Sequence, residues 1–345
     1  MEAPRWNLTR NWPKYSQLGS ETGTARVPEE FRSHTLELPA SSAGLRLDQA
    51  LAQALPQYSR ARLKSWIEVG AVQVEGRVPR PRDKVLGGER VQIEARLEAD
   101  DRIEPEDLPL EVLHKDRALL VINKPAGLVV HPGAGNRAHT LQNALLALDP
   151  RLALVPRAGL VHRLDRDTSG LLVVARTVEA HAALVAALAA REIERRYVAI
   201  CTGVMTAGLT VDEPIGRHRT ARTRMTVRAD GRPAVTHLRV LKRFRAHTLV
   251  QAHLETGRTH QIRVHLAHAG YPVVGDPLYG GRRRIPPACT PELRERLAAL
   301  HRQALHAERL ELNHPSTGRS VSFEAPLPQD MRALIAALEA DLNAR

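Results

Sequence analysis

The sequence predicts an α+β protein with two folded parts. A small N-terminal part of helices and strands precedes a larger part, which is built on a large mixed, mostly antiparallel sheet with flanking helices. Three observations predict this. The chain has 345 residues, more than one domain usually holds. Its apolar runs of strand length are interspersed with helical segments that do not alternate with them regularly. A strongly acidic stretch divides the chain into the two parts.

The N-terminal part begins after a segment without hydrophobic periodicity. Residues 1–40 are therefore predicted to be a poorly ordered tail, and residues 44–98 to be the first compact unit. Within that unit one helix is predicted to begin after Ser59 as N-cap and to end at Gly70. Its apolar face comprises Leu63, Trp66 and Ile67, and the side chains predicted to project from it are Arg60, Arg62 and Lys64. The strand that follows is predicted to turn at Glu75-Gly76.

The dividing stretch is acidic and contains two prolines. Eight acidic residues and two arginines lie between Glu94 and Glu111. We therefore expect residues 99–111 to form an exposed linker that would repel a polyanion.

Residues 112–345 are predicted to form the second domain. Strands are expected in the segments ALLVINKP, GLLVVAR, RRYVAIC and TLVQAHLETG. Helices are expected in TLQNALLAL, EAHAALVAALAA and THQIRVHLAHAG, and from about Gln329 to Asn343. The third of these helices is predicted to have Thr259 as its N-cap and to stop at Gly270.

Composition narrows the classes of partner and compartment. The chain has 50 Lys and Arg against 38 Asp and Glu, a net charge of +12, which favours a polyanion such as nucleic acid; the alternative is an arginine-rich proteome. No apolar run approaches the ~20 residues of a membrane span, so no membrane partner is expected. Cys201 and Cys289 form neither a disulfide framework nor a CxxC pair, which indicates a reducing compartment, the cytoplasm.

One segment, GLVHRLDRDTSGLLVVAR, places charged residues between two apolar runs. The loop from His162 to Ser169 must lie at the end of a sheet, where flanking buried strands would hold a reactive group rigidly. Two interpretations remain open on the loop alone. Asp165 and Asp167 cap a turn and pair with neighbouring arginines, or one of them is a catalytic carboxylate.

Three further segments hold candidate functional groups. TGRTHQIRVHLAHAGYPVVGDPLYG contains Arg258, His260 and Arg263, which are either anion contacts or ordinary surface residues. Its histidines lack an HExxH pattern, so no metal site is predicted. NKPAGLVVHPGAGN lacks the P-loop pattern and is interpreted as a rigid turn. Tyr197 lies in a predicted strand, where a lone tyrosine is usually a core residue.

Together these segments resemble the RluA/RluD-type pseudouridine synthases. The resemblance runs from about residue 44 to residue 330, with HRLD and GRTHQIRVH as its most specific motifs. The N-terminal segment RLDQALAQALPQYSRARLKSWIEVGAVQVEGR resembles an S4 RNA-binding domain. The resemblance implies an S4 domain over residues 44–98 and a pseudouridine synthase catalytic domain over residues 112–345.

The resemblance also implies roles for individual residues. Asp165 matches the family's catalytic aspartate and Arg263 the arginine that pairs with it. Tyr197 matches the tyrosine that packs against the target base. Substrate or RNA contacts are implied for the following residues: His162, Arg163, Arg258 and His260 in the catalytic domain, and Arg60, Arg62 and Lys64 in the S4 domain. Asp167 is assigned to loop structure.

The implied activity is isomerisation of specific uridines in large-subunit (23S) ribosomal RNA. The C1′–N1 bond breaks, the uracil rotates and a C1′–C5 bond forms, with no redox change and no cofactor or metal required. The expected partner is 23S rRNA or a large-subunit precursor, and the protein is expected to be a monomer. Two alternatives stay open: a non-catalytic S4-type RNA-binding ribosome assembly factor, and a base glycosylase using Asp165 and Asp167.

Overall fold

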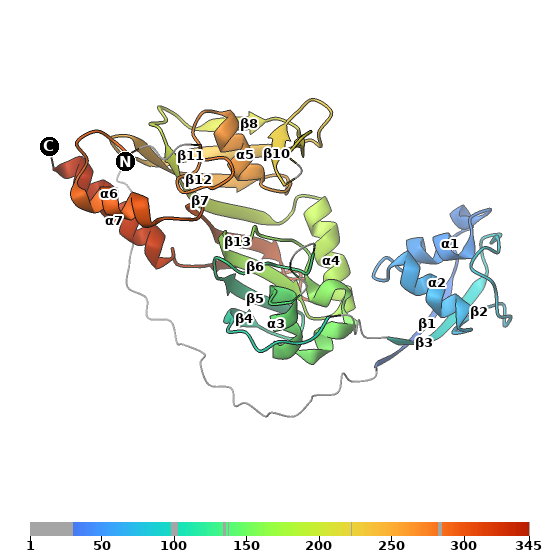
Figure 1. The fold of residues 1–345 in the computed structure, drawn as a ribbon. Helices are drawn as coiled ribbons and strands as arrows, with labels where there is room; N and C mark the ends of the chain where they lie inside the picture. Colours follow the sequence, from blue (N-terminus) through green and yellow to red (C-terminus); the bar gives the residue numbers. More distant parts are fainter. Residues whose placement is uncertain are drawn as a thin grey trace.

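The computed structural model describes residues 30–97, 103–133, 136, 138–221, 223–281 and 285–344. They form a small N-terminal domain and a larger domain that carries most of the strands (Figure 1). The small domain contains a three-stranded sheet of order β1-β3-β2 and two helices. Its elements are β1 (Glu30–Glu37), α1 (Leu47–Ala54), α2 (Arg60–Glu68), β2 (Val72–Val74) and β3 (Arg90–Leu97), with a short 3₁₀ helix at Ala40–Ser42.

Helix α2 forms as its sequence predicts. The Ser59 hydroxyl accepts the Arg62 backbone N–H at 3.2 Å, which satisfies one of the free donors of the first turn. Leu63, Trp66 and Ile67 are buried. They pack in one apolar cluster with residues of β3 and with Leu154 and Val178 of the larger domain, so the two domains share a core contact.

Strand β1 corrects the prediction of a tail to residue 40, which is wrong for residues 30–37. The strand pairs with β3 along its whole length. Its half-buried face carries Glu30, Arg32, His34 and Leu36, so it lacks the apolar alternation by which strands are recognised. Polar contacts stabilise this face instead, including a 2.9 Å hydrogen bond between His34 Nε2 and the Tyr58 hydroxyl.

The larger domain is built on a nine-stranded sheet of order β4-β5-β6-β13-β7-β12-β11-β8, with β14 paired to β13. Among the described strands of this sheet, β6 and β13 pair in parallel and all other neighbours pair antiparallel, so the prediction of a mixed, mostly antiparallel sheet is confirmed. The strands are β4 (Glu111–Lys115), β5 (Leu119–Lys124), β6 (Ser169–Ala175), β7 (Glu194–Thr202), β8 (Leu209–Asp212), β11 (Val235–Arg243), β12 (His247–Leu254), β13 (Leu305–Asn313) and β14 (Ser320–Glu324). A separate ribbon pairs β9 (Ile215–Arg217) with β10 (Met225–Val227).

Helices flank this sheet (Figure 1). They are α3 (Leu141–Leu148), α4 (Val178–Ala189), α5 (Gln261–His268), α6 (Pro291–Ala299) and α7 (Gln329–Asn343), with 3₁₀ turns at Pro150–Leu154 and Pro156–Gly159. Helices α3, α4 and α7 match the predicted segments. No helix in the described ranges is long and apolar enough to cross a bilayer.

One predicted local feature is wrong. Thr259 is not the N-cap of α5; His260 occupies that position with a left-handed φ of 58° and makes no side-chain cap bond. Residues 103–111 of the predicted exposed linker are exposed or half-buried, but they also contact the larger domain. Ile103 packs against the main core, and the Glu106 carboxylate accepts the His139 backbone N–H at 2.8 Å. Residues 98–102 lie outside the described ranges.

A buried histidine predicts acid sensitivity of the larger domain. His247 on β12 is 1% exposed, and neither ring nitrogen has a hydrogen-bond partner among the described residues. Burial lowers its pKa from 6.5 to about 4. Between these values the unfolded chain binds the proton and the folded chain does not. The free energy of unfolding therefore falls as pH falls, by about 1.4 kcal/mol per unit.

We expect His247→Leu to remove this pH dependence of the free energy of unfolding. Between pH 6.5 and pH 5, wild-type protein should lose roughly 2 kcal/mol more stability than the variant, as measured by urea unfolding at both pH values. His268→Leu is the matched control, because that side chain is exposed. Equal acid losses in wild type and His247→Leu would contradict the prediction.

Candidate active site

The Asp165 carboxylate lies at the end of the central strands. Its loop precedes β6, whose seven residues are all buried. Gly170, with φ of +114°, lets β6 approach β13 closely, because a Cβ there would lie 2.2 Å from the Ala307 carbonyl oxygen. The loop is therefore fixed to the core at its C-terminal end, while Asp165 itself stays partly exposed, with 16% of its side chain accessible.

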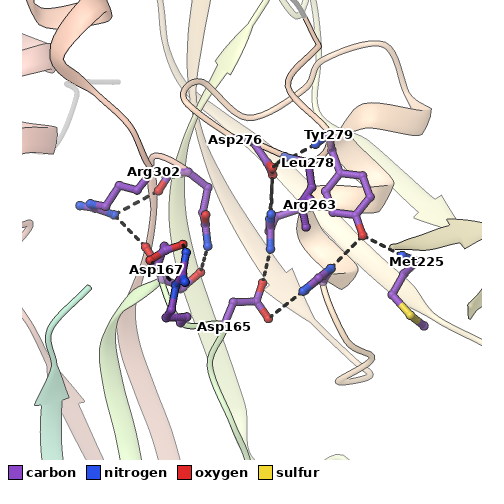
Figure 2. Close-up of polar contacts among 12 residues, drawn as sticks. Asp165, Asp167, Met225, Arg263, Asp276, Leu278, Tyr279 and Arg302 are labelled. Atoms are coloured by element: carbon purple, nitrogen blue, oxygen red, sulfur yellow. Dashed lines mark hydrogen bonds and ion pairs between the residues drawn. The ribbon is translucent and has the colours of Figure 1, made fainter. Parts of the chain in front are cut away.

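Arg263, in the first turn of α5, holds Asp165 across 98 residues of sequence. Its Nη1 donates to Asp165 Oδ2 at 2.9 Å. The remaining edge of the guanidinium donates to Asp276, from Nε to Oδ2 at 2.7 Å and from Nη2 to Oδ1 at 2.8 Å. Figure 2 shows Arg263 between the two carboxylates. One arginine thus links a buried carboxylate to a partly exposed one.

Asp276 anchors the arginine and was not singled out by the sequence analysis. Its side chain is fully buried, and its Oδ1 also accepts the backbone N–H groups of Leu278 and Tyr279 at 2.9 and 3.0 Å. Burial by itself would lower the pKa of Arg263, but the carboxylates of Asp276 and Asp165 outweigh burial and raise it above its usual value. Arg263 is therefore a permanent cation.

His260 faces the other oxygen of Asp165. Its Nε2 lies 3.8 Å from Asp165 Oδ1, and its Nδ1 lies 2.8 Å from the Tyr279 hydroxyl. That hydroxyl accepts the Met225 N–H at 2.8 Å (Figure 2), which leaves its own proton for Nδ1. Burial lowers the pKa of His260. A neutral ring whose Nδ1 accepts the tyrosine proton carries its own proton on Nε2, the nitrogen nearer to Asp165.

Tyr197, the third candidate catalytic residue beside Asp165 and Arg263, lies on β7. Its side chain is 6% exposed, and burial raises the pKa of its phenol. Asp165, Tyr197 and Arg263 line one cavity of about 540 Å³. The same cavity is lined by the other four catalytic-domain residues named from the sequence, namely His162, Arg163, Arg258 and His260. The cavity is large enough for a nucleoside, and arginines outnumber acidic residues among the charged side chains that line it.

Known proteins match this chain over most of its length. Residues 118–268 match the model of the RNA pseudouridylate synthase family, and residues 45–91 match that of the S4 domain. A protein from Xanthomonas campestris named ribosomal large subunit pseudouridine synthase D is 54% identical over 88% of this chain and 92% of its own length. The Escherichia coli K12 protein of the same name is 53% identical over 90% and 95%.

The chain belongs to the RNA pseudouridylate synthase family. It therefore has the activity of an RNA pseudouridine synthase, an isomerase, and carries an S4 domain at its N-terminus. A solved structure supports the fold: human RNA pseudouridylate synthase domain containing 4 has a TM-score of 0.52 and 27% identity, covering 66% of this chain and 93% of its own.

Within this candidate site, the side chains of two loop residues contact neighbouring residues of the chain. His162 Nε2 accepts the Val173 backbone N–H of β6 at 3.1 Å, and burial lowers its pKa to about 3, so the ring is neutral. Asp167 forms a fork with Arg166, with both distances 3.0 Å. Asp167 thus pairs with a neighbouring arginine of the loop, as one of the two interpretations predicted. Asp165 does not, because its partner is Arg263 on α5.

Lys124 is a second residue that the sequence analysis did not single out. It is fully buried at the end of β5 in the segment interpreted as a rigid turn. Its ammonium donates to three backbone carbonyls, those of Pro125, Leu128 and Arg166, at 2.8 to 2.9 Å. Since Arg166 adjoins Asp165, Lys124 ties the backbone of the Asp165 loop to the turn after β5. The signal in the sequence that could have identified it is a lysine at the end of an apolar run, where lysine is uncommon.

The three S4-domain residues lie apart from the cavity. Arg60 forms hydrogen bonds of 3.0 and 2.8 Å with buried Asp48, and Lys64 pairs with Glu68 at 3.3 Å. Arg62 does not simply project, as the sequence suggested, because its Nη1 donates to the Leu154 carbonyl at 3.2 Å. Arg60 and Lys64 line a shallow second cavity of about 340 Å³ together with Arg46 and Arg82.

Proposed function

We propose that this pseudouridine synthase isomerises uridines in large-subunit (23S) ribosomal RNA, acting in the cytoplasm as a monomer. The names of relatives at 53–54% identity over almost their whole length support the substrate class. The observation that carries the site assignment is the 2.9 Å contact between Arg263 and Asp165 in a cavity that also contains Tyr197.

Asp165 acts on the sugar of the target nucleotide. A uridine in a stem must leave its stack before C1′ is accessible, which costs a few kcal/mol. The carboxylate must be ionised to attack or stabilise C1′ as the C1′–N1 bond breaks. The Arg263 guanidinium orients this carboxylate through one of its oxygens, and Nε2 of His260 lies 3.8 Å from the other oxygen.

Tyr197 packs against the detached uracil and is a candidate for removing the C5 proton. Arg163, exposed at the cavity edge, fills the gap that the extruded base leaves in the RNA, and Arg258 contacts the backbone there. His162 and His260 shape the pocket wall. Arg60, Arg62 and Lys64 belong to the S4 face, where phosphate contacts give salt-dependent affinity with little sequence information.

The test is conversion of uridine in unmodified 23S rRNA transcript by purified protein, in buffer without added metal or cofactor. Nuclease digestion and chromatography with mass detection should find pseudouridine formed with no free uracil released. Free uracil would indicate a glycosylase. RNA binding without any product would indicate the non-catalytic assembly factor, which the clamped carboxylate disfavours.

A further inference from the structure

Arg195 on β7 is a buried cation that has no counter-ion among the described residues. The residue is 8% exposed, and its Nε is buried with no hydrogen-bond partner in the part of the chain that the structure describes. Within the described ranges its guanidinium forms no ion pair. Other buried arginines of this chain are paired: Arg263 with Asp276 at 2.7 Å, and Arg176 with Asp149 at 2.7 Å. An unpaired buried charge is costly, so an unsatisfied one indicates a group that the folded chain does not supply.

The guanidinium of Arg195 lies in the active-site cavity. Arg195 and Tyr197 alternate with Arg196 along the strand, so they share one face, and both line the cavity with Asp165. On the loop before α5, a Cβ at Gly257 would lie 2.8 Å from Arg195 Nη1. Because Gly257 has no side chain, the Arg195 guanidinium can occupy this space. Arg196 points to the opposite face and pairs with Glu194 at 2.8 Å.

Depth in the cavity indicates which part of the substrate Arg195 meets. Arg163 and Arg191 line the cavity but are exposed, as suits contacts to RNA phosphates at its edge. Arg195 is as buried as Tyr197, where only an extruded base reaches. Deepening the function proposed above, on which this inference rests, we propose that Arg195 donates to a carbonyl oxygen of the uracil and stabilises the negative charge of the detached base.

The chemistry of the reaction requires such a group. When C1′–N1 breaks, the bonding electron pair stays on the uracil and spreads to its O2 and O4 oxygens. C1′ makes up the pair by bonding to the Asp165 carboxylate, or C2′ gives up its proton to that carboxylate, and both routes leave the same uracil anion. After rotation, C5 bonds to C1′ as the C1′–O bond to Asp165 breaks, or as C2′ takes its proton back from the carboxylic acid. C5 then loses its proton and N1 gains one, so the product is an isomer of the substrate. A fixed cation in a water-poor pocket stabilises this transient charge strongly.

The experiment separates binding from chemistry in single-turnover reactions at saturating 23S rRNA transcript. We expect Arg195→Met to lower the saturating rate by roughly 10²–10³-fold, as loss of one oxyanion donor does, with the Kd for RNA changed less than about threefold. Arg195→Lys should restore part of the rate. Gly257→Ala should lower it by displacing the guanidinium. Arg196→Met is the matched control and should resemble wild type.

A second substrate identifies the charge on the base as the target. The fluorine of 5-fluorouridine lowers the basicity of the departing uracil anion, so that anion needs less stabilisation by Arg195. The rate loss of Arg195→Met, measured as consumption of 5-fluorouridine, should therefore be smaller than its rate loss on uridine. Equal defects on both substrates would overturn the proposal in favour of a structural role. Weaker binding with an unchanged saturating rate would overturn it in favour of a phosphate contact. Wild-type protein that forms no pseudouridine would instead overturn the proposed function itself.

Discussion

The Asp165→Asn variant is expected to lose turnover by on the order of 10⁴-fold or more while still binding RNA. The amide cannot attack C1′ or balance positive charge on the sugar, yet it keeps the shape of the carboxylate. Since Asp165 is only partly buried and adds a negative charge near a polyanion, its removal should leave the Kd unchanged or slightly lower. Single-turnover pseudouridine formation and RNA titration measure the two quantities.

Asp167→Asn is the control for that variant. Asp167 lies two residues away in the same loop, but its carboxylate pairs with the exposed Arg166 side chain. Exposed pairs of this kind contribute at most about 1 kcal/mol. We therefore expect a turnover within a few-fold of wild type. An active Asp165→Asn protein, or an equally inactive Asp167→Asn protein, would remove the assignment of Asp165 to the reacting sugar.

Asp276→Asn is expected to affect both stability and turnover. It leaves the buried Arg263 guanidinium with Asp165 as its only carboxylate partner in the described structure. Breaking a buried ion pair at one partner typically lowers the free energy of unfolding by about 3–5 kcal/mol. We expect turnover at saturating RNA to fall on the order of 10²-fold, because a displaced arginine no longer orients Asp165. Urea unfolding and single-turnover rates measure the effects.

Asp230→Asn provides the comparison. Asp230 also forms a fork with an arginine, Arg228, but its side chain is 66% exposed. Its loss should leave both the urea midpoint and turnover close to those of wild type, because exposed ion pairs contribute little to stability. If Asp276→Asn behaves like this surface variant, the buried pair does not position Arg263, and Asp165 is held by its loop alone.

Much of the fold was predictable because the central strands are apolar and continuous. The runs that form β5, β6, β7 and β12 carry their own hydrophobic signal, as do helices α3, α4 and α7. Strand β1 was missed because its inner face is polar. The attachment of the second half of the acidic stretch to the larger domain was missed because it is made by backbone and carboxylate contacts. Such contacts leave no periodic trace in the sequence.

The sequence by itself determined the α+β class and the family, and it predicted the candidate residues Asp165, Tyr197 and Arg263, because buried runs and dense motifs are local properties. Only the tertiary structure decided which charges meet. It gave Arg263 two carboxylate partners, made Asp276 the anchor and left Arg195, near Tyr197, without an ion-pair partner among the described residues. The reason is physical: a charge's partner depends on distances between segments about a hundred residues apart, and burial sets the strength of the contact.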